Sequence, residues 1–321
     1  MTETQDLNMA KPPPDDIIPA PKLKISVAQF QPKTCDPETN FATACSKIRA
    51  AAIEHHSHLI VLPEYHLTSW APNHPTFKDS CRHAESYLPR YQQLAKDLNI
   101  HIVPGTIITH HPSENPTELR NMTYLIAAGT GEILTSYQKR NLWHPERDVL
   151  TPSAPAPHQA FDLPIQGTEH TIRAGLLICW DFAFPEPFRE LTILGGAELV
   201  IVPAWWHLRE VNAHTKRLNP DSEIAFLDGV AVARAFENTC AVVLCNAFGR
   251  SQVAMPVLGR VGEIGVEEEG EVVTEIDFGV VRYAEEVYKV RGDGKRRYEG
   301  EAEVPDANPG GGGALKCVMT G

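Results

Sequence analysis

The chain has none of the features that mark a membrane protein or a nucleic-acid-binding protein. No segment approaches the roughly 18 consecutive apolar residues that span a bilayer. Positive charge is scarce: 29 Lys and Arg residues stand against 41 Asp and Glu residues, which gives a formal net charge of −12 at pH 7. Because nucleic acids and anionic membranes attract basic surfaces, this balance predicts that neither is a partner.

Cysteine and histidine lack the spacings that build disulfide frameworks and zinc sites. The seven cysteines are scattered, odd in number and without a Cys-x-x-Cys pair, which is typical of a reducing compartment. The 14 histidines do not occur at zinc-ligand spacing. We therefore predict a cytoplasmic protein with no metal site and no cofactor. The cysteines are Cys35, Cys45, Cys81, Cys179, Cys240, Cys245 and Cys317.

The two ends of the chain differ in composition from the rest. Residues 1–21 are polar and rich in proline, without the apolar core of a secretory signal. Residues 300–321 are rich in glycine. We predict that both ends are disordered arms and that residues 22–299 form one domain.

Strand and helix patterns alternate between these ends, which is typical of an α/β fold. The patterns at 122–128 and 132–137 flank Gly129-Thr-Gly131 and indicate an antiparallel hairpin, which favours mixed sheets over purely parallel ones. Strands are predicted at 24–30, 59–62, 101–108, 122–128, 132–137, 172–178, 199–203, 240–246, 252–258 and 271–277, and helices at 38–55, 82–98, 186–195 and 222–237.

Cys179 ends an apolar run, Gly175-Leu-Leu-Ile-Cys179, and Pro185-Glu186 indicates the start of a helix soon after it. A helix N-terminus favours a thiolate, and its backbone N–H groups can hold a developing oxyanion. A lone cysteine is more often a small buried hydrophobe, so Cys179 alone does not establish a reactive thiol.

Two other predicted strands also end at isolated charged residues. Leu59-Ile-Val-Leu-Pro63 stops at Glu64, and the shorter pattern from Gly131 stops at Lys139. Each residue alone is most simply a solvated side chain. Sites in open α/β sheets collect at the carboxyl ends of strands, so a Glu, a Lys and a Cys in that position together indicate one site.

These segments resemble the nitrilase superfamily of carbon–nitrogen hydrolases. The resemblance covers roughly residues 22 to 290 and consists of several motifs in order, which makes it more specific than any one motif. The matching segments are Lys24 to Pro32, Val61-Leu-Pro-Glu64, Tyr137-Gln-Lys-Arg-Asn-Leu142 with Glu146 downstream, Cys179-Trp-Asp181, Phe184-Pro-Glu186, Ala233 to Asn238, Asn246 and Gly249-Arg-Ser251.

The resemblance implies a four-layer α-β-β-α sandwich with two mixed β-sheets and helices outside. It also implies a homodimer or a higher homo-oligomer that forms through helices near 186–195. The family's second glutamate would be Glu146, which would orient Lys139 or the substrate. A surface ion pair between Glu146 and Arg140 or Arg147 is the structural alternative.

The chemistry expected of these residues is amide hydrolysis. Cys179 would be the nucleophile, and Glu64 would carry its proton to the leaving amine and later activate water. Lys139 would stabilise the oxyanion, helped by the backbone N–H of Trp180. For Glu64 this role needs a raised pKa, which burial provides.

Aromatic residues that follow the strand ends are candidates for binding the substrate: Tyr65, Trp180, Trp205 and Trp206. Core packing is an equal alternative for them. The long polar segment 207–221 is a candidate lid. Asn121 and Asp181 are expected to serve the scaffold, Asp181 as a helix cap.

The branch of the family is suggested by one residue. Nitrilases typically carry Cys-Trp-Glu, whereas this chain carries Cys179-Trp-Asp181, which favours a small amide or N-carbamoyl amine as the substrate. A nitrile stays open, because the same thiol would form a thioimidate from it. A catalytically silent scaffold and a redox-sensing thiol protein are the alternatives outside hydrolysis.

Overall fold

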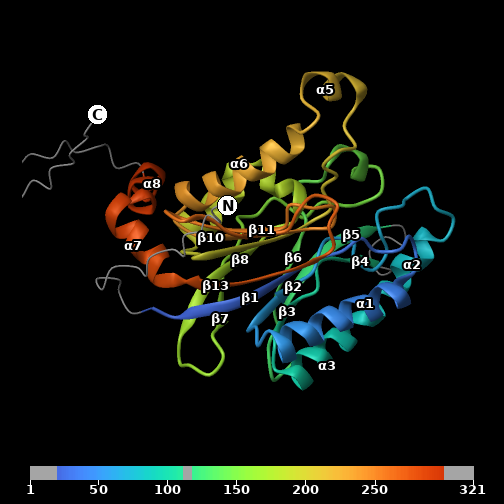
Figure 1. Cartoon of the computed structure of the whole chain (residues 1–321), viewed down its shortest axis with the longest axis horizontal. Coiled ribbons are helices and arrows are strands. Elements are labelled where there is room, and N and C mark those ends of the chain that lie inside the picture. Colours follow the sequence, from blue (N-terminus) through green and yellow to red (C-terminus); the bar gives the residue numbers. More distant parts are fainter. Residues whose placement is uncertain (1–19, 111–117, 300–321) are drawn as a thin grey trace, which may run out of the picture.

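Two mixed β-sheets lie face to face in the computed structural model, which describes residues 20–110 and 118–299 (Figure 1). Helices cover the outer face of each sheet, so the layers run helix, sheet, sheet, helix. The predicted four-layer α/β sandwich is confirmed. The predicted arms fall mostly on residues 1–19 and 300–321, which are outside the described part of the chain.

The first sheet has seven strands and combines parallel and antiparallel pairs. β1 pairs in parallel with β2 and antiparallel with β13, and β5 pairs antiparallel with β3, β4 and β6. In sheet order the strands are β13 (Gly270–Asp277), β1 (Lys22–Gln29), β2 (Leu59–Val61), β3 (His101–Val103), β5 (Leu119–Ile126) and β4 (Ile107–His110), with β6 (Ile133–Gln138) on β5.

The second sheet has six strands, and its three central strands are parallel. Antiparallel strands complete both of its edges. In sheet order the strands are β12 (Gly259–Glu263), β11 (Gln252–Met255), β10 (Ala241–Asn246), β9 (Leu199–Ala204), β8 (Thr171–Leu176) and β7 (Phe161–Pro164).

The helices divide between the two outer faces and the C-terminal end of the chain. α1 and α3 pack on the first sheet, α4 and α6 pack on the second, and α7 and α8 lie together at one end (Figure 1). The helices are α1 (Pro37–Arg49), α2 (Phe77–Ala84), α3 (Leu88–Leu98), α4 (Pro185–Arg189), α5 (Ala213–Leu218), α6 (Ser222–Glu237), α7 (Phe278–Tyr288) and α8 (Val290–Glu299).

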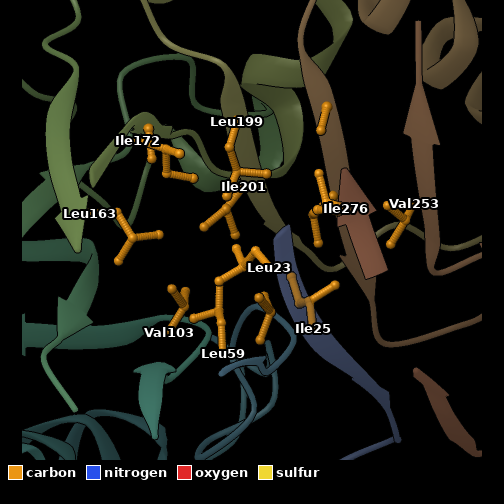
Figure 2. Packing of buried hydrophobic residues seen from close by; sticks show 14 of the residues in the cluster. Leu23, Ile25, Leu59, Val103, Leu163, Ile172, Leu199, Ile201, Val253 and Ile276 are labelled. Carbon is orange, nitrogen blue, oxygen red and sulfur yellow. The ribbon is translucent and has the colours of Figure 1, made fainter. Parts of the chain in front are cut away.

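The main core fills the space between the two sheets, where side chains from opposite sheets point toward one another (Figure 2). Alternation along the strands explains this packing. In β9, Leu199 and Ile201 enter the core between the sheets, whereas Val200 and Val202 pack outward under the helices. Successive strand residues face opposite sides, so a strand covered on both sides must be apolar throughout.

Most predicted elements are confirmed within a few residues. The predicted helix 222–237 is α6, and the predicted helix 38–55 is α1 followed by a π-helical turn at Ala50–Glu54. At the start of α1, Asp36 accepts a hydrogen bond from the Thr39 backbone N–H at 3.2 Å, and Pro37 occupies the first turn.

Several sequence predictions of secondary structure were wrong. The predicted helix 82–98 is two helices, α2 and α3, joined by a 3-10 turn at Glu85–Tyr87. β7, β12, α7 and α8 were missed, and the segment 207–221 contains α5. α8 carries two glycines and a mainly polar sequence, and none of its side chains over 290–298 is buried, so no apolar period indicated it. Arg291 anchors its start by donating to the Asn238 carbonyl oxygen at 3.1 Å and to the Thr239 hydroxyl at 2.9 Å.

A helix must be both long and apolar to cross a bilayer. Within residues 20–110 and 118–299, no helix combines the length and the apolarity needed to cross a membrane. Three large apolar side chains remain exposed on helical segments: Leu194 at the end of the π-helical turn Glu190–Leu194, Phe236 in α6 and Tyr288 at the end of α7. Assembly through residues 186–195 stays a prediction, as does the cytoplasmic location.

The predicted strand 101–108 is broken by Pro104 and Gly105 into β3 and β4. Gly105 has a φ of +60°, and a Cβ at this position would lie only 1.9 Å from the Pro63 carbonyl oxygen. The backbone of the residue before Glu64 therefore packs directly against Gly105. Close backbone approach of this kind requires glycine.

We predict that Gly105→Ala lowers the free energy of unfolding by on the order of 3 kcal/mol, because strain at positive φ adds to a backbone clash. Gly167→Ala is the matched control: Gly167 has a φ of +72°, and a Cβ there would meet nothing within 4 Å. It should lose only about 1 kcal/mol. Urea unfolding measures both, and equal losses would contradict the close-approach argument.

Candidate active site

Glu64, Lys139 and Cys179 converge from three strand ends, two in the first sheet and one in the second. Glu64 follows β2, Lys139 follows β6 directly, and Cys179 follows β8. Glu64 and Lys139 are fully buried, and Cys179 retains an exposed fraction of 6%. The structure therefore brings together the three residues that the sequence placed at separate strand ends.

The Lys139 ammonium lies between two carboxylates. Its Nζ donates to Glu64 Oε1 at 2.8 Å and to Glu146 Oε1 at 2.7 Å. An ammonium has three N–H donors, so one remains for another acceptor. The alternative surface ion pair of Glu146 is wrong: Arg140 pairs with Glu190, and Arg147 donates to the Leu142 carbonyl oxygen.

Glu146 is held by three donors in all. Besides Lys139, the Tyr65 hydroxyl donates to Oε1 at 2.5 Å, and the Trp143 backbone N–H donates to Oε2 at 2.8 Å. Glu146 belongs to a short 3-10 turn, His144–Glu146, that follows the Lys139 segment. The carboxylate is therefore fixed in place and fully engaged.

Glu64 is held on one oxygen only. Its Oε1 accepts from Lys139 and from Asn121 Nδ2, the latter at 2.8 Å. Among the described residues, Oε2 has no partner that meets hydrogen-bond geometry, although it is buried. The open oxygen makes Glu64 the carboxyl of the pair that can take up a proton.

The pKa shift of Glu64 agrees with the difference in hydrogen bonding between the two carboxylates. Burial raises the pKa of Glu64 to about 7, with a further increase from the Glu146 charge, while Lys139 and the Cys179 thiol lower it. Burial alone would lower the pKa of Lys139, but Glu64, Cys179 and Glu146 together raise it. Lys139 therefore stays an ammonium, and Glu64 can exchange a proton near neutral pH.

Cys179 begins a 3-10 turn, Cys179–Ala183, and has a φ of +42°, which is rare for a residue with a side chain. α4 begins only at Pro185, so the sulfur does not lie at an α-helix N-terminus as the sequence suggested. Burial and the Glu64 charge raise the pKa of Cys179 well above its usual value, against the influence of Lys139. This direction favours the protonated thiol, in agreement with the prediction that Glu64 takes the thiol proton.

Asp181 joins the Cys179 turn to the Lys139 segment. The fully buried carboxylate accepts the Ile178 backbone N–H at 2.9 Å, as a cap would. It also accepts the Asn141 backbone and side-chain N–H groups at 2.9 Å each and the Tyr137 hydroxyl at 2.8 Å. Four donors from two segments fix the position of Cys179 relative to Lys139.

A cavity of about 620 Å³ opens above Cys179 and Glu146. All five tryptophans of the chain line it, although they are spread over more than a hundred residues of sequence. The lining residues are Tyr65, Trp70, Trp143, His144, Glu146, Cys179, Trp180, Ala183, Trp205, Trp206, His207, Glu210, Val211, Asn212, Thr215, Glu223 and Phe226.

The four aromatic residues predicted to bind substrate, Tyr65, Trp180, Trp205 and Trp206, all line this cavity. Tyr65 also contacts the charged groups of the site. Its hydroxyl donates to Glu146, and its ring centroid lies 5.9 Å from Lys139 Nζ. The role of each in binding stays a prediction.

Sequence reasoning missed several residues of the site. Asn121 was assigned to the scaffold, but its amide donates to Glu64 and to the Tyr65 hydroxyl. Trp70, Trp143 and Phe226 were not singled out. One signal in the sequence could have found the two missed tryptophans. Trp70 follows the Glu64 motif before α2, and Trp143 follows the Lys139 motif just before Glu146.

The predicted lid segment 207–221 forms one side of the cavity. It carries α5, which projects from the body beyond α6 (Figure 1). His207, Glu210 and Thr215 are among the lining residues that it contributes. Closure of this segment stays a prediction.

The acidic and sulfur-bearing side chains of the site do not form a metal-binding set. In the part of the chain that the structure describes, no group of three or more His, Cys, Asp or Glu side chains is arranged to hold a metal ion.

The chain is similar to known carbon–nitrogen hydrolases over most of its length. The model of the carbon-nitrogen hydrolase family matches residues 24–285. A 2-oxoglutaramate amidase of Bacillus subtilis is 30% identical over 266 residues, which cover 80% of this chain and 91% of the relative. A nitrilase of Pyrococcus abyssi is 25% identical over 272 residues, which cover 81% and 92%.

A solved structure supports the fold. Nit3 of Saccharomyces cerevisiae, a member of the nitrilase superfamily, has a TM-score of 0.67 at 24% identity and is covered to 96%, against 85% of this chain. The chain therefore belongs to the carbon-nitrogen hydrolase family, the nitrilase superfamily, and to its amidase-like branch. It is an enzyme of the carbon–nitrogen hydrolase class.

We predict that Asp181→Ala lowers the free energy of unfolding by about 3 kcal/mol, because it leaves several buried donors without an acceptor. Asp162→Ala is the control, since Asp162 forms an exposed ion pair with Arg173. That change should cost less than about 1 kcal/mol. Chemical unfolding monitored by circular dichroism measures both. Similar losses for the two variants would show that Asp181 does not join the two segments.

Proposed function

We propose that the enzyme hydrolyses the carbon–nitrogen bond of a small amide or N-carbamoyl amine through a Cys179 acyl-enzyme. The observation that carries the proposal is the Lys139 ammonium held at 2.8 Å from Glu64 and 2.7 Å from Glu146, beneath a cavity that Cys179 lines. This arrangement supplies a nucleophile, a proton carrier and a charge stabiliser in one buried place.

Acylation begins with a neutral thiol. Cys179 Sγ attacks the substrate carbonyl carbon while its proton passes to Glu64, whose Oε2 accepts no hydrogen bond from the described residues. The carbonyl oxygen gains negative charge and takes the third N–H of Lys139 together with the Trp180 backbone N–H. Glu64 then gives its proton to the leaving nitrogen, so that ammonia or an amine departs. An amide leaves a thioester on Cys179, and an N-carbamoyl amine leaves a thiocarbamate.

Deacylation uses the same residues, with water in place of the thiol as the nucleophile. Glu64, again a carboxylate, removes a proton from water as the water oxygen attacks the thioester carbon. Lys139 stabilises the second oxyanion. Its collapse releases a carboxylic acid from the thioester, or a carbamic acid from the thiocarbamate, while Cys179 recovers a proton from Glu64. Glu146 takes no part in proton transfer in this scheme, and it holds Lys139 between the two carboxylates.

A nitrile is the second candidate substrate, and the similarity to a nitrilase of Pyrococcus abyssi favours keeping it. Cys179 would add to the nitrile carbon and give a thioimidate, with Glu64 supplying the proton to nitrogen. The amide is preferred because the Bacillus subtilis relative, at 30% identity, is named as an amidase.

The two alternatives outside hydrolysis have less support. A redox-sensing cysteine needs an exposed thiol with a lowered pKa, whereas burial raises the pKa of Cys179. A silent scaffold gains nothing from burying an ammonium and two carboxylates, because buried charges are costly to desolvate.

We predict that ammonia is released from primary amides or from N-carbamoyl amines, and that Cys179→Ala lowers the rate by roughly 10⁴-fold or more. The measurement is ammonia release from a panel of amides, carbamoyl amines and nitriles. Cys240→Ala is the control, because Cys240 is buried outside the cavity and should be dispensable for turnover. Equal rates for wild type and Cys179→Ala would exclude the acyl-enzyme.

We also predict that kcat/KM for an uncharged amide falls as the pH drops through about 7, because protonated Glu64 cannot accept the thiol proton. Glu146→Gln should move this acidic limb to lower pH, since the Glu146 charge raises the pKa of Glu64. It should also lower kcat, because Lys139 loses a charged partner.

The pH profiles of wild type, Glu146→Gln and Glu169→Gln test this directly. Glu169 is exposed and lies outside the cavity, so its variant controls for the loss of one negative charge. A limb that stays in place or moves to higher pH in Glu146→Gln would contradict the assignment of Glu64 as the titrating group.

A further inference from the structure

The cavity above Cys179 is lined by carboxylates and by the imidazoles of His144 and His207, but by no Lys or Arg side chain of the described residues. The carboxylates are those of Glu146, Glu210 and Glu223. Lys139 lies below, fully buried and engaged with Glu64 and Glu146. An anionic group on a substrate would therefore meet no fixed positive charge in the space that its tail must occupy.

One wall of the cavity is a continuous set of aromatic rings. Trp206 lies 5.2 Å from Trp180 and stacks on Phe226 at 5.4 Å between ring centroids. Glu223 is fixed at the edge of this wall, since its Oε2 accepts the Trp206 indole N–H at 2.7 Å. Aromatic faces with an adjacent carboxylate form the usual environment for an organic cation.

Glu210 adds a second negative charge to the cavity lining. Its ionic neighbour among the described residues is His207, at 3.3 Å. Burial lowers the pKa of His207 despite the opposing influence of Glu210. The imidazole is therefore mainly neutral at neutral pH and does not neutralise Glu210, whose side chain is 75% exposed and therefore partly screened by solvent.

We infer that this cavity selects an amide whose tail carries a positive charge, such as an ammonium or a quaternary ammonium group. Glu223 is the main specificity-determining residue, with the more exposed Glu210 beside it, and the Trp180 ring contacts the cation. The inference rests on the proposed amide hydrolysis and adds the chemical class of the substrate to it.

The proposed preference for a cationic substrate differs from the substrate for which the Bacillus subtilis relative is named. The Bacillus subtilis relative is a 2-oxoglutaramate amidase, and 2-oxoglutaramate carries a carboxylate at neutral pH. A site for such a substrate needs a cationic or hydrogen-bonding partner for that group. The lining of this cavity presents the carboxylates of Glu210 and Glu223 instead.

The test compares three amides of equal chain length that differ only in the terminal group. The terminal groups are trimethylammonium, its neutral isostere tert-butyl, and carboxylate (glutaramate). Binding is measured with Cys179→Ala protein by intrinsic tryptophan fluorescence, because every tryptophan of the chain lines this cavity. Isothermal calorimetry on the same samples gives the affinities independently.

The expected order of affinity is cation, neutral isostere, anion, with the cationic amide at least about tenfold tighter than glutaramate. Adding Glu223→Gln or Glu210→Gln should reduce the ratio of the cationic to the neutral affinity several-fold. Gln can still accept the Trp206 N–H, so the wall keeps its geometry. Glu169→Gln is the matched control and should leave that ratio unchanged.

Glutaramate binding as tightly as the cationic amide, or more tightly, would overturn the inference, as would an unchanged ratio in both cavity variants. Turnover by the wild-type protein is measured with the same three amides and keeps the two proposals distinct. Preferential hydrolysis of glutaramate would refute the selectivity and leave the hydrolase intact. Tight binding of the cationic amide without hydrolysis of any amide would instead refute the proposed amide hydrolysis.

Discussion

The buried ammonium of Lys139 is the constraint on which the site depends. An ammonium without solvent must be paired, and here Glu64 and Glu146 both accept its hydrogen bonds. Two carboxylates and one ammonium leave one negative charge in excess in a buried place. That excess favours uptake of a proton, and Glu64 is the carboxyl with an open oxygen among the described residues. The proton carrier is therefore a consequence of how the lysine is buried.

The fold positions this charge cluster through contacts between loops rather than within single elements. Asp181 binds donors from both the Cys179 turn and the segment after Lys139. Gly105 lets β3 and β4 turn against the Pro63 carbonyl, one residue before Glu64. The two sheets supply rigid strand ends, and these contacts set the distances between the groups that those ends carry.

The sequence was sufficient to predict that Glu64, Lys139 and Cys179 form one site and that Glu64 has a raised pKa, but not the raised pKa of Cys179. Strand ends that stop at Glu64, Lys139 and Cys179 follow from local patterns, because an apolar run interrupted by charge is visible in one dimension. The protonated state of Cys179 depends on burial and on its distance from Glu64, which only the folded chain defines. The position of Asn121 on Glu64 was missed for the same reason. α8 was missed because its two glycines and mainly polar sequence give no apolar helical period.

Burial beside Lys139 and Glu146 raises the pKa of Glu64 to about 7, so this carboxyl should titrate near neutral pH. Infrared difference spectroscopy across a pH titration tests it most directly, with Glu64→Gln protein subtracted from wild type to isolate the protonated-carboxyl band. If Glu64 titrates near neutral pH, this band grows as the pH is lowered through about 7. A Glu64 carboxyl that protonates only near its ordinary pKa, about 4.3, would contradict it.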